Sequence, residues 1–185
     1  MAFEQRSYEV LEQDGRFELR QYAPAIVAET VVNGDFEKVG SSAFRILVAY
    51  IGGENETRTS IAMTAPVTQQ AESREIAMTA PVTQQRAQDG YRFSFVMPSD
   101  LTLETLPVPK DPRVVLREDA GRGFASVRYS GFWTRTNYEL RLAELRSWME
   151  ERGIEASGEP VWARYDPPFM PWFLRTNEIL IGVTE

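Results

Sequence analysis

The chain has 185 residues, of which 43 % are hydrophobic and 25 % charged, and its formal net charge is −7. This size and composition are typical of one globular domain, and the acidic balance disfavours a nucleic-acid partner, which needs a basic surface. The sequence contains no cysteine and no histidine, which excludes disulfides, Ser-His-Asp triads, thiolate nucleophiles and an imidazole ligand to a metal.

The N-terminal sequence MAFEQRSYEV lacks the basic start and apolar run of a signal peptide. No stretch approaches the ~20 apolar residues of a membrane-spanning helix. Together with the lack of cysteine, these features predict a soluble, cytoplasmic protein without a membrane span. No pattern in the sequence indicates its oligomeric state.

Alternation and β-branched residues predict strands over residues 16–21, 25–32 and 91–97 in the first half of the chain. A helix is expected after the second strand, since apolar side chains recur there at helical spacing. The residues on that face are Phe36, Val39, Ala43, Leu47 and Tyr50. Asp35 is the expected N-cap, and Gly52-Gly53 is the expected end.

A short segment of the first half occurs twice. Residues 60–70 (SIAMTAPVTQQ) are repeated almost unchanged as residues 75–85 (EIAMTAPVTQQ). We interpret this as a tandem duplication that lengthened a loop or hairpin. The alternative is that both Met-Thr-Ala-Pro segments line one site.

The second half follows the same plan. When Leu19-Arg20 is aligned with Leu116-Arg117, the same offset pairs Ala28 with Ala125, Gly34 with Gly131 and Phe36 with Trp133. Strands are predicted over 113–118, 124–129, 160–165 and 178–183. Between them Tyr138, Leu142, Leu145 and Met149 predict a helix with a Thr136–Glu139 capping box and a stop at Gly153. The chain therefore reads as a single α+β domain, 1–185, with pseudo-repeats over about 8–98 and 101–185 and a cleft between them.

Four segments, in order, resemble the SOUL/haem-binding protein family: IAMTAPV at 61–67, FVMP at 95–98, ARYDPP at 163–168 and RTNE at 175–178. The match runs from about Tyr8 to Val183. The resemblance implies a duplicated ββαβ unit that forms a distorted antiparallel β-barrel or sheet with two flanking helices. It also implies binding of haem or a related tetrapyrrole in an apolar groove. The wider relatives include gyrase-inhibitor-like domains, some of which bind or hydrolyse small molecules in the cleft.

The first helix carries apolar residues beyond its core face, at Phe44, Val48 and Ile51, with Arg45 beside them. Either loops cover this second stripe, or it forms a shallow groove for a flat apolar ligand. The resemblance implies that this helix is one wall of the groove and that basic side chains hold the haem propionates. Arg45 is one candidate, and Arg175, close to Trp172, is the other, although either could form a surface ion pair.

Met63 and Met78 are candidate haem contacts because a thioether can ligate iron, usually opposite a histidine. Their alternative role is to fill the core. Without histidine, a bound haem or porphyrin would be held by apolar contact and charge, without a strong axial ligand. The leading hypothesis is a non-catalytic carrier, buffer or sensor of a tetrapyrrole.

Two other functions stay open. Glu178, as a general base with Tyr129 or Tyr165, would suit a small-molecule hydrolase or isomerase. The structural alternative is that Glu178 fixes its strand through hydrogen bonds. The third hypothesis is a protein-interaction module that uses the second apolar stripe of the first helix.

Overall fold

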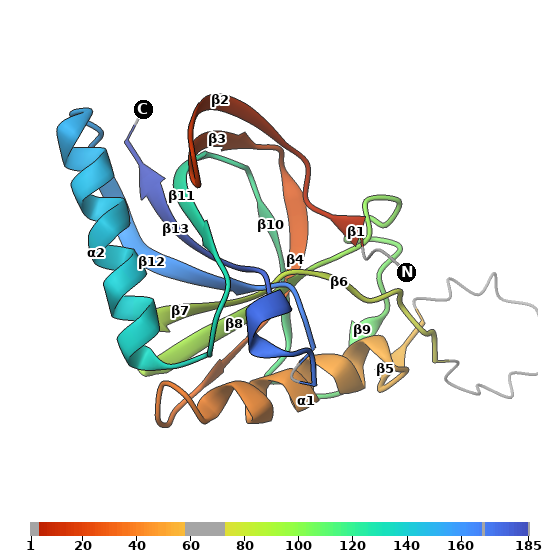
Figure 1. Ribbon diagram of the computed structural model, residues 1–185. Coiled ribbons are helices and arrows are strands. Elements are labelled where there is room, and N and C mark those ends of the chain that lie inside the picture. The colour runs from red at the N-terminus through yellow and green to blue at the C-terminus, as the bar shows by residue number, and fades with distance from the viewer. Residues whose placement is uncertain (1–3, 58–72, 168, 185) are drawn as a thin grey trace, which may run out of the picture.

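A curved β-sheet with two helices packed on one face makes up the computed structural model, which describes residues 4–57, 73–167 and 169–184 (Figure 1). The helices are α1 (Val39–Ile51) and α2 (Arg135–Glu151), with a short 3-10 helix, η1 (Trp172–Leu174). The strands are β1 (Glu4–Gln5), β2 (Tyr8–Asp14), β3 (Phe17–Tyr22), β4 (Ala25–Val32), β5 (Asn55–Glu56), β6 (Thr79–Ala80), β7 (Val82–Ala87), β8 (Gly90–Val96), β9 (Val108–Pro109), β10 (Val115–Asp119), β11 (Gly123–Tyr129), β12 (Ala156–Arg164) and β13 (Asn177–Val183).

Nine of these strands form the main sheet, in the order β10-β4-β8-β7-β12-β13-β11-β3-β2. Every neighbouring pair is antiparallel. The described strands do not close into a barrel, since β10 and β2 remain edges. The predicted α+β class, with a distorted antiparallel sheet and two flanking helices, is confirmed. None of the helices in the described ranges is long and apolar enough to cross a bilayer.

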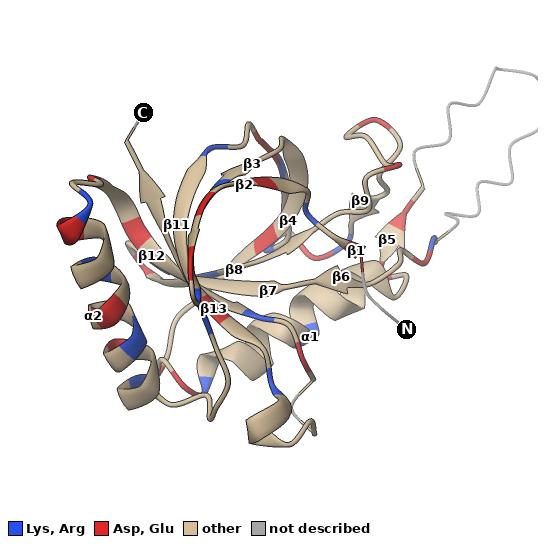
Figure 2. Cartoon of the chain, turned by 45° about the horizontal axis from the view of Figure 1, so that its top comes forward, with Lys and Arg blue, Asp and Glu red and all other residues tan. Residues whose placement is uncertain are grey.

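The two faces of the sheet differ because successive strand residues point to opposite sides. In β8, Phe93 and Phe95 are buried in the core with the inner faces of α1 and α2, whereas Arg92 and Ser94 point to the other face. The predicted helical face is buried as expected, with Phe36 in the turn before α1 and Val39, Ala43, Leu47 and Tyr50 in α1 itself. Charged residues of both signs lie along the outer side of α2 (Figure 2). The sheet therefore has a covered face and a concave face away from the helices.

Both predicted N-caps are wrong, whereas both predicted helix ends are confirmed. Asp35 accepts from the backbone N–H of Glu37 at 3.0 Å and so organises the turn before α1, which begins four residues later. Thr134 caps α2 by accepting from the backbone N–H of Asn137, so the cap lies two residues before Thr136. Gly52 and Gly153 end the helices, the latter with φ of +64°.

The strand order shows an exchange between the two halves. Read from one side, β10, β4, β8 and β7 follow one another, and β3, β11, β13 and β12 follow in the same way from the other side, inside β2. The first strand of each half pairs with the second strand of the other, β3 with β11 and β10 with β4. This is the order that a duplicated unit with exchanged first strands would give.

The remaining differences concern strand bounds and the duplicated segment. Strand β2 carries mostly exposed side chains and was not predicted, because its EVLEQD pattern lacks a buried face. Strand β12 begins earlier than expected, with a register shift between Ser157 and Val161. The second copy of the duplicated segment supplies β6 and the start of β7, and the first copy lies outside the described residues.

Candidate functional site

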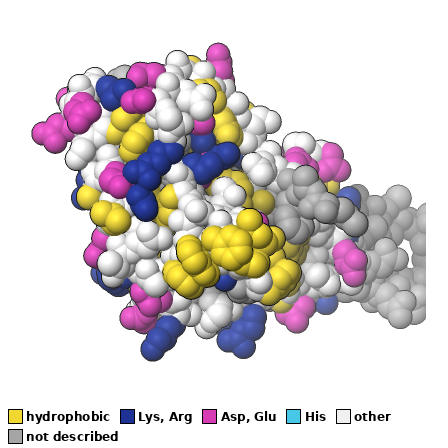
Figure 3. All heavy atoms as spheres, viewed as in Figure 1, with side chains coloured by type: hydrophobic (Ala, Val, Ile, Leu, Met, Phe, Trp, Pro, Cys, Tyr) yellow, Lys and Arg dark blue, Asp and Glu magenta, His cyan; other side chains and the backbone are white. Residues whose placement is uncertain are grey.

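Large apolar side chains are exposed at the connection between β12 and β13. Phe169, Trp172, Phe173 and Leu174 are 47–85 % exposed. Trp172 stacks on Phe132, with ring centroids 5.0 Å apart, and meets Phe173 edge to face at 5.6 Å. Figure 3 shows a hydrophobic patch over η1, with basic side chains above it on the same face. Contiguous exposed aromatic surface of this kind is typical of a ligand or partner site. We call these side chains the exposed apolar cluster, which comprises Phe132, Phe169, Trp172, Phe173 and Leu174.

The second stripe of α1 is only partly on the surface. Phe44 is 37 % exposed, and its ring meets Phe95 of the core at 5.8 Å. Arg45 is exposed and Val48 half-buried, whereas Ile51 is 4 % exposed and belongs to the core. Both ribbon views place η1 next to α1 (Figures 1 and 2). The sequence-predicted residues Phe44, Arg45, Trp172 and Arg175 therefore come from two neighbouring elements, and Ile51 does not add exposed surface.

Two guanidinium groups lie close to the ring of Trp133. Arg175 is 4.3 Å from the ring centroid and Arg164 is 5.4 Å from it. The indole N–H of Trp133 donates to Asn177 Oδ1 at 2.7 Å, which fixes the plane of the ring. Arg175 is tethered by donating from Nε to the carbonyl of Met170 at 2.8 Å. Two cations are thus held beside the β12–β13 connection.

Arg164 is the residue of this region that the sequence interpretation missed. Its guanidinium also lies 4.9 Å from the Trp162 ring, donates to Gln84 Oε1 at 3.2 Å, and pairs with no carboxylate in the described residues. Burial lowers the pKa of Arg164 to about 10. A Cβ placed on Gly40 of α1 would lie 3.0 Å from Arg164 Nη2, so the charge lies directly beneath the first turn of α1. Only the contacts reveal that Arg164 lacks a carboxylate partner, since in the sequence it is one arginine in an otherwise ordinary strand.

The methionine candidates are not brought together in the described structure. Met78 is half-buried and packs against the core, whereas Met63 lies outside the described residues. Among the described residues, no group of three or more acidic side chains is arranged to hold a metal ion.

Glu178 is fully buried and accepts hydrogen bonds at both carboxylate oxygens. Arg20 donates from two guanidinium nitrogens at 2.8 and 2.9 Å, Arg128 Nε donates at 2.9 Å, and the Tyr165 hydroxyl donates at 2.6 Å. Burial alone would raise the pKa of Glu178, but hydrogen bonds and charge from Arg20, with Tyr165 and Arg128, outweigh it and hold that pKa below its ordinary value. Glu178 is therefore a carboxylate whose charge is already compensated.

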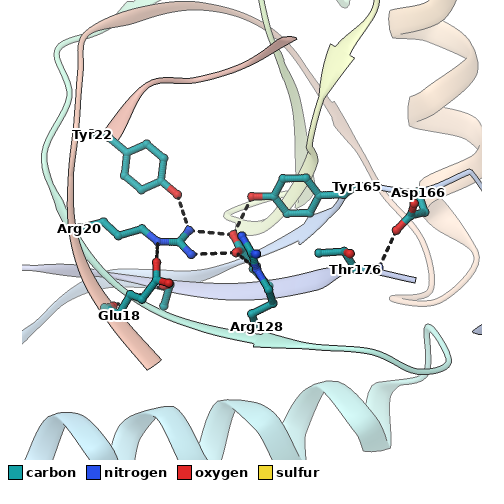
Figure 4. A network of polar contacts seen from close by, with 9 residues as sticks. Glu18, Arg20, Tyr22, Arg128, Tyr165, Asp166 and Thr176 are labelled. Carbon is teal, nitrogen blue, oxygen red and sulfur yellow. Dashed lines mark hydrogen bonds and ion pairs between the residues drawn. The ribbon is translucent and has the colours of Figure 1, made fainter. Parts of the chain in front are cut away.

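Arg20 extends this network along β3 (Figure 4). Its Nε donates to Glu18 Oε2 at 2.6 Å, and its Nη1 donates to the Tyr22 hydroxyl at 3.0 Å. The guanidinium also lies 4.3 Å from the centroid of the Tyr8 ring. The network therefore links β3, β11 and β13 on the concave face.

The three residues of the catalytic alternative do not share one site. Tyr165 touches Glu178, and burial raises the pKa of its hydroxyl above the ordinary value. Tyr129 belongs to the core on the helix side, where burial likewise raises its pKa. The Glu178 carboxylate faces two arginines, which weakens it as a base. These contacts match the structural interpretation of Glu178 more closely than the catalytic one.

Comparison with known proteins links this chain to one family. A model described as "SOUL heme-binding protein" matches residues 3–182. "Heme-binding protein 1" of Xenopus tropicalis is 26 % identical over 175 residues, which cover 90 % of this chain and 87 % of the relative. "Heme-binding protein 2" of Homo sapiens is 28 % identical over 170 residues, with 90 % of this chain and 78 % of the relative covered.

Solved structures share the fold at lower identity. A structure described as a hydrolase from Listeria innocua superposes with a TM-score of 0.59 at 14 % identity, covering 94 % of both chains. The EcmrR C-terminal domain superposes with a TM-score of 0.55 at 14 % identity, covering 96 % of this chain and 98 % of that one. At this identity the likeness shows the fold alone.

Proposed function

We propose, from the premise that this chain belongs to the SOUL heme-binding protein family, that it binds haem or a related tetrapyrrole without catalysing a reaction on it. The observation that carries the proposal is the exposed apolar cluster next to α1, with arginines beside it. The described residues fit such a group, because a flat ring that bears carboxylates needs apolar contact over its faces and cations at one edge.

The apolar contacts would come from the two elements already described. Trp172 and Phe173 present exposed ring surface on the β12–β13 connection, and Phe44 and Val48 present the partly exposed side of α1. The rings of Trp172 and Phe132 are already stacked on one another, so the surface is preorganised and little side-chain entropy is lost on binding.

The charge contacts would come from arginine. Arg45 is exposed on α1, and Arg175 and Arg164 both lie close to the Trp133 ring. Arg164 has no carboxylate partner in the described residues, so a propionate that approached it would relieve an uncompensated buried charge. We place the carboxylate edge of the ligand toward this pair.

Weak ligation of the iron points to a carrier or buffer. A bound haem supplies a redox-active iron, but the sequence has no histidine or cysteine to hold that iron tightly. Binding would then rest on apolar and ionic contacts that can be reversed, as release to a second protein requires. Met78 would pack in the core rather than ligate.

Titration with haemin tests the proposal. We expect a saturable change in the Soret absorbance and quenching of tryptophan fluorescence, because Trp172 is 47 % exposed within the proposed surface. Trp172→Ala should weaken binding by at least about tenfold, the effect expected when a large aromatic contact is lost from a binding surface. Leu140→Ala, which removes a 54 % exposed side chain from α2, is the matched control and should leave binding unchanged. A wild-type protein that gives no saturable change at micromolar concentration would exclude this function.

A further inference from the structure

A cavity lies on the concave face of the sheet, away from the helices. Its volume is about 120 Å³, and its walls are alternate side chains of strands on both halves of the sheet. In β8, Arg92 and Ser94 point into it, while the neighbouring Phe93 lies in the core. The cavity is therefore separated from the proposed tetrapyrrole surface by the sheet itself.

One part of the cavity wall is aromatic. Tyr8, Tyr22, Phe124 and Tyr165 line it. Tyr22 meets Tyr8 at a centroid distance of 5.0 Å and Phe124 edge to face at 5.5 Å. A cavity of roughly 150 Å³ holds one benzene ring in another protein. The space here, about 120 Å³, is somewhat smaller, so it sets an upper limit of one aromatic ring on the ligand.

The polar part of the wall is strongly basic. Arg6, Arg92, Arg117 and Arg122 line the cavity together with one carboxylate, Asp119. This basic surface stands out in a chain whose formal net charge is −7.

Ion pairs compensate only part of this charge. Asp119 pairs with Arg6 at 2.8 Å, and Glu29 pairs with Arg117 at 2.9 Å. Arg92 Nε is 3.6 Å from Glu29, too far for a hydrogen bond, and this buried nitrogen has no acceptor among the described residues. Arg122 lies 4.7 Å from the Phe124 ring centroid and pairs with no described carboxylate.

The neighbouring network does not supply the missing negative charge. Glu18 and Glu178 are matched there by Arg20 and Arg128. Four arginines of the cavity thus face two carboxylates, Asp119 and Glu29. Because an unsatisfied buried guanidinium nitrogen is costly, an incoming carboxylate would be favoured.

We infer that this cavity is a second binding site, for a small aromatic carboxylate of the benzoate type. The ring would pack among Tyr8, Tyr22 and Phe124. The carboxylate would take hydrogen bonds from Arg122, which pairs with no described carboxylate, and from Arg92, whose ion pair with Glu29 is long at 3.6 Å. The inference does not depend on tetrapyrrole binding, since it uses different residues on the opposite face of the sheet.

Calorimetric titration with sodium benzoate tests this site, with benzyl alcohol and benzylammonium as uncharged and cationic probes of similar size. We expect saturable binding of benzoate at millimolar ligand and no binding of the other two. Arg122→Gln and, separately, Arg92→Gln should each weaken benzoate binding at least about fivefold, as expected for the loss of a charged hydrogen bond. The matched control, Arg146→Gln, removes an exposed arginine from α2 and should have no effect.

Three results would overturn the inference: no saturable heat with benzoate, equal binding of benzyl alcohol, or benzoate binding that both cavity variants retain. Circular dichroism confirms that the variants are folded. Haemin titration of Arg122→Gln should match the wild type, so that failure of this site and failure of the tetrapyrrole proposal can be told apart.

Discussion

Arg20 and Glu178 form a two-point ion pair in the interior, with Nη1–Oε2 and Nη2–Oε1 distances of 2.9 and 2.8 Å and side-chain exposures of 1 % and 0 %. The residues come from β3 and β13, which do not neighbour each other in the sheet, since β11 lies between them. The pair therefore joins the two halves of the chain across an intervening strand.

Loss of one member should destabilise the fold strongly. Arg20→Met leaves a buried carboxylate with only Arg128 as a cationic partner, and removal of one partner from a buried pair typically costs about 3–5 kcal/mol. We expect a fall of that order in the free energy of unfolding, measured with urea. The double variant Arg20→Met, Glu178→Met should recover part of the loss, and a double variant less stable than Arg20→Met would contradict this account.

The stability of the protein should depend on pH through Glu178. Its pKa in the folded state is lowered from the ordinary value of 4.5, so the unfolded chain binds a proton more readily. The stabilisation is thus fully present above about pH 4.5 and is lost as the pH falls through the folded pKa. We expect the difference in stability between wild type and Glu178→Gln to shrink below about pH 4.5 in urea titrations. A stability difference that stays constant down to about pH 3 would contradict this role of Glu178.

The N-cap of α2 allows a matched test of two threonines. Thr134→Ala removes the acceptor for the backbone N–H of Asn137, which should cost about 1 kcal/mol. Thr136→Ala changes another exposed threonine within the helix, where alanine has the higher helix propensity, and should cost nothing. Thermal unfolding of both variants measures the difference, and an equal loss would place the cap elsewhere.

Gly121, in the connection between β10 and β11, packs closely against the backbone of the connection between β3 and β4. Its φ is +80°, and a Cβ there would lie 2.3 Å from the carbonyl oxygen of Tyr22. Gly153 also has a positive φ, +64°, but its Cβ would meet no atom within 4 Å. We expect Gly153→Ala to cost about 1–2 kcal/mol from the left-handed conformation alone, and Gly121→Ala to cost clearly more. Chemical denaturation checks both, and similar losses would rule out the backbone clash.

Charge reversal should weaken tetrapyrrole binding without unfolding the protein. Arg45 is exposed on α1, and Arg45→Glu would place a negative charge where the propionates are proposed to dock. We expect weaker haemin binding, with a loss that diminishes at high salt because exposed charges are screened. Arg146→Glu is the control on α2. Unchanged haemin affinity in Arg45→Glu would show that the propionates do not dock beside α1.

The sequence predicted those features that leave a periodic signal. Strand alternation predicted seven of the main-sheet strands, most of them to within a few residues, and residues 25–32 match β4. Helical spacing predicted the buried face of α1. The two caps were misplaced for different reasons. Helix α1 begins at Val39, four residues after Asp35, and has no side-chain cap. At α2, Thr134 and Thr136 were both available, and only backbone geometry decides which of them accepts the hydrogen bond. Strand β2 escaped because its side chains are mostly exposed.

The candidate sites were harder to predict. Phe44, Arg45 and Trp172 could be proposed from an excess of apolar residues and a family resemblance. Arg164 could not, because its significance lies in the absence of a nearby described carboxylate, which depends on how β12 meets α1 and Trp133. The basic cavity was also hidden, because its arginines come from strands that are far apart in the chain.

The exchange of first strands has a consequence for synthesis on the ribosome. When the first half emerges, β3 has no β11 to pair with and β4 has no β10. One hydrogen-bonding edge therefore stays open until residue 119 has been made for β4, and until residue 129 has been made for β3. An open strand edge invites association with other nascent chains. We therefore expect the sheet to be completed only after β11 has been made, and a chaperone to be most needed while only the N-terminal half of the chain has been synthesised.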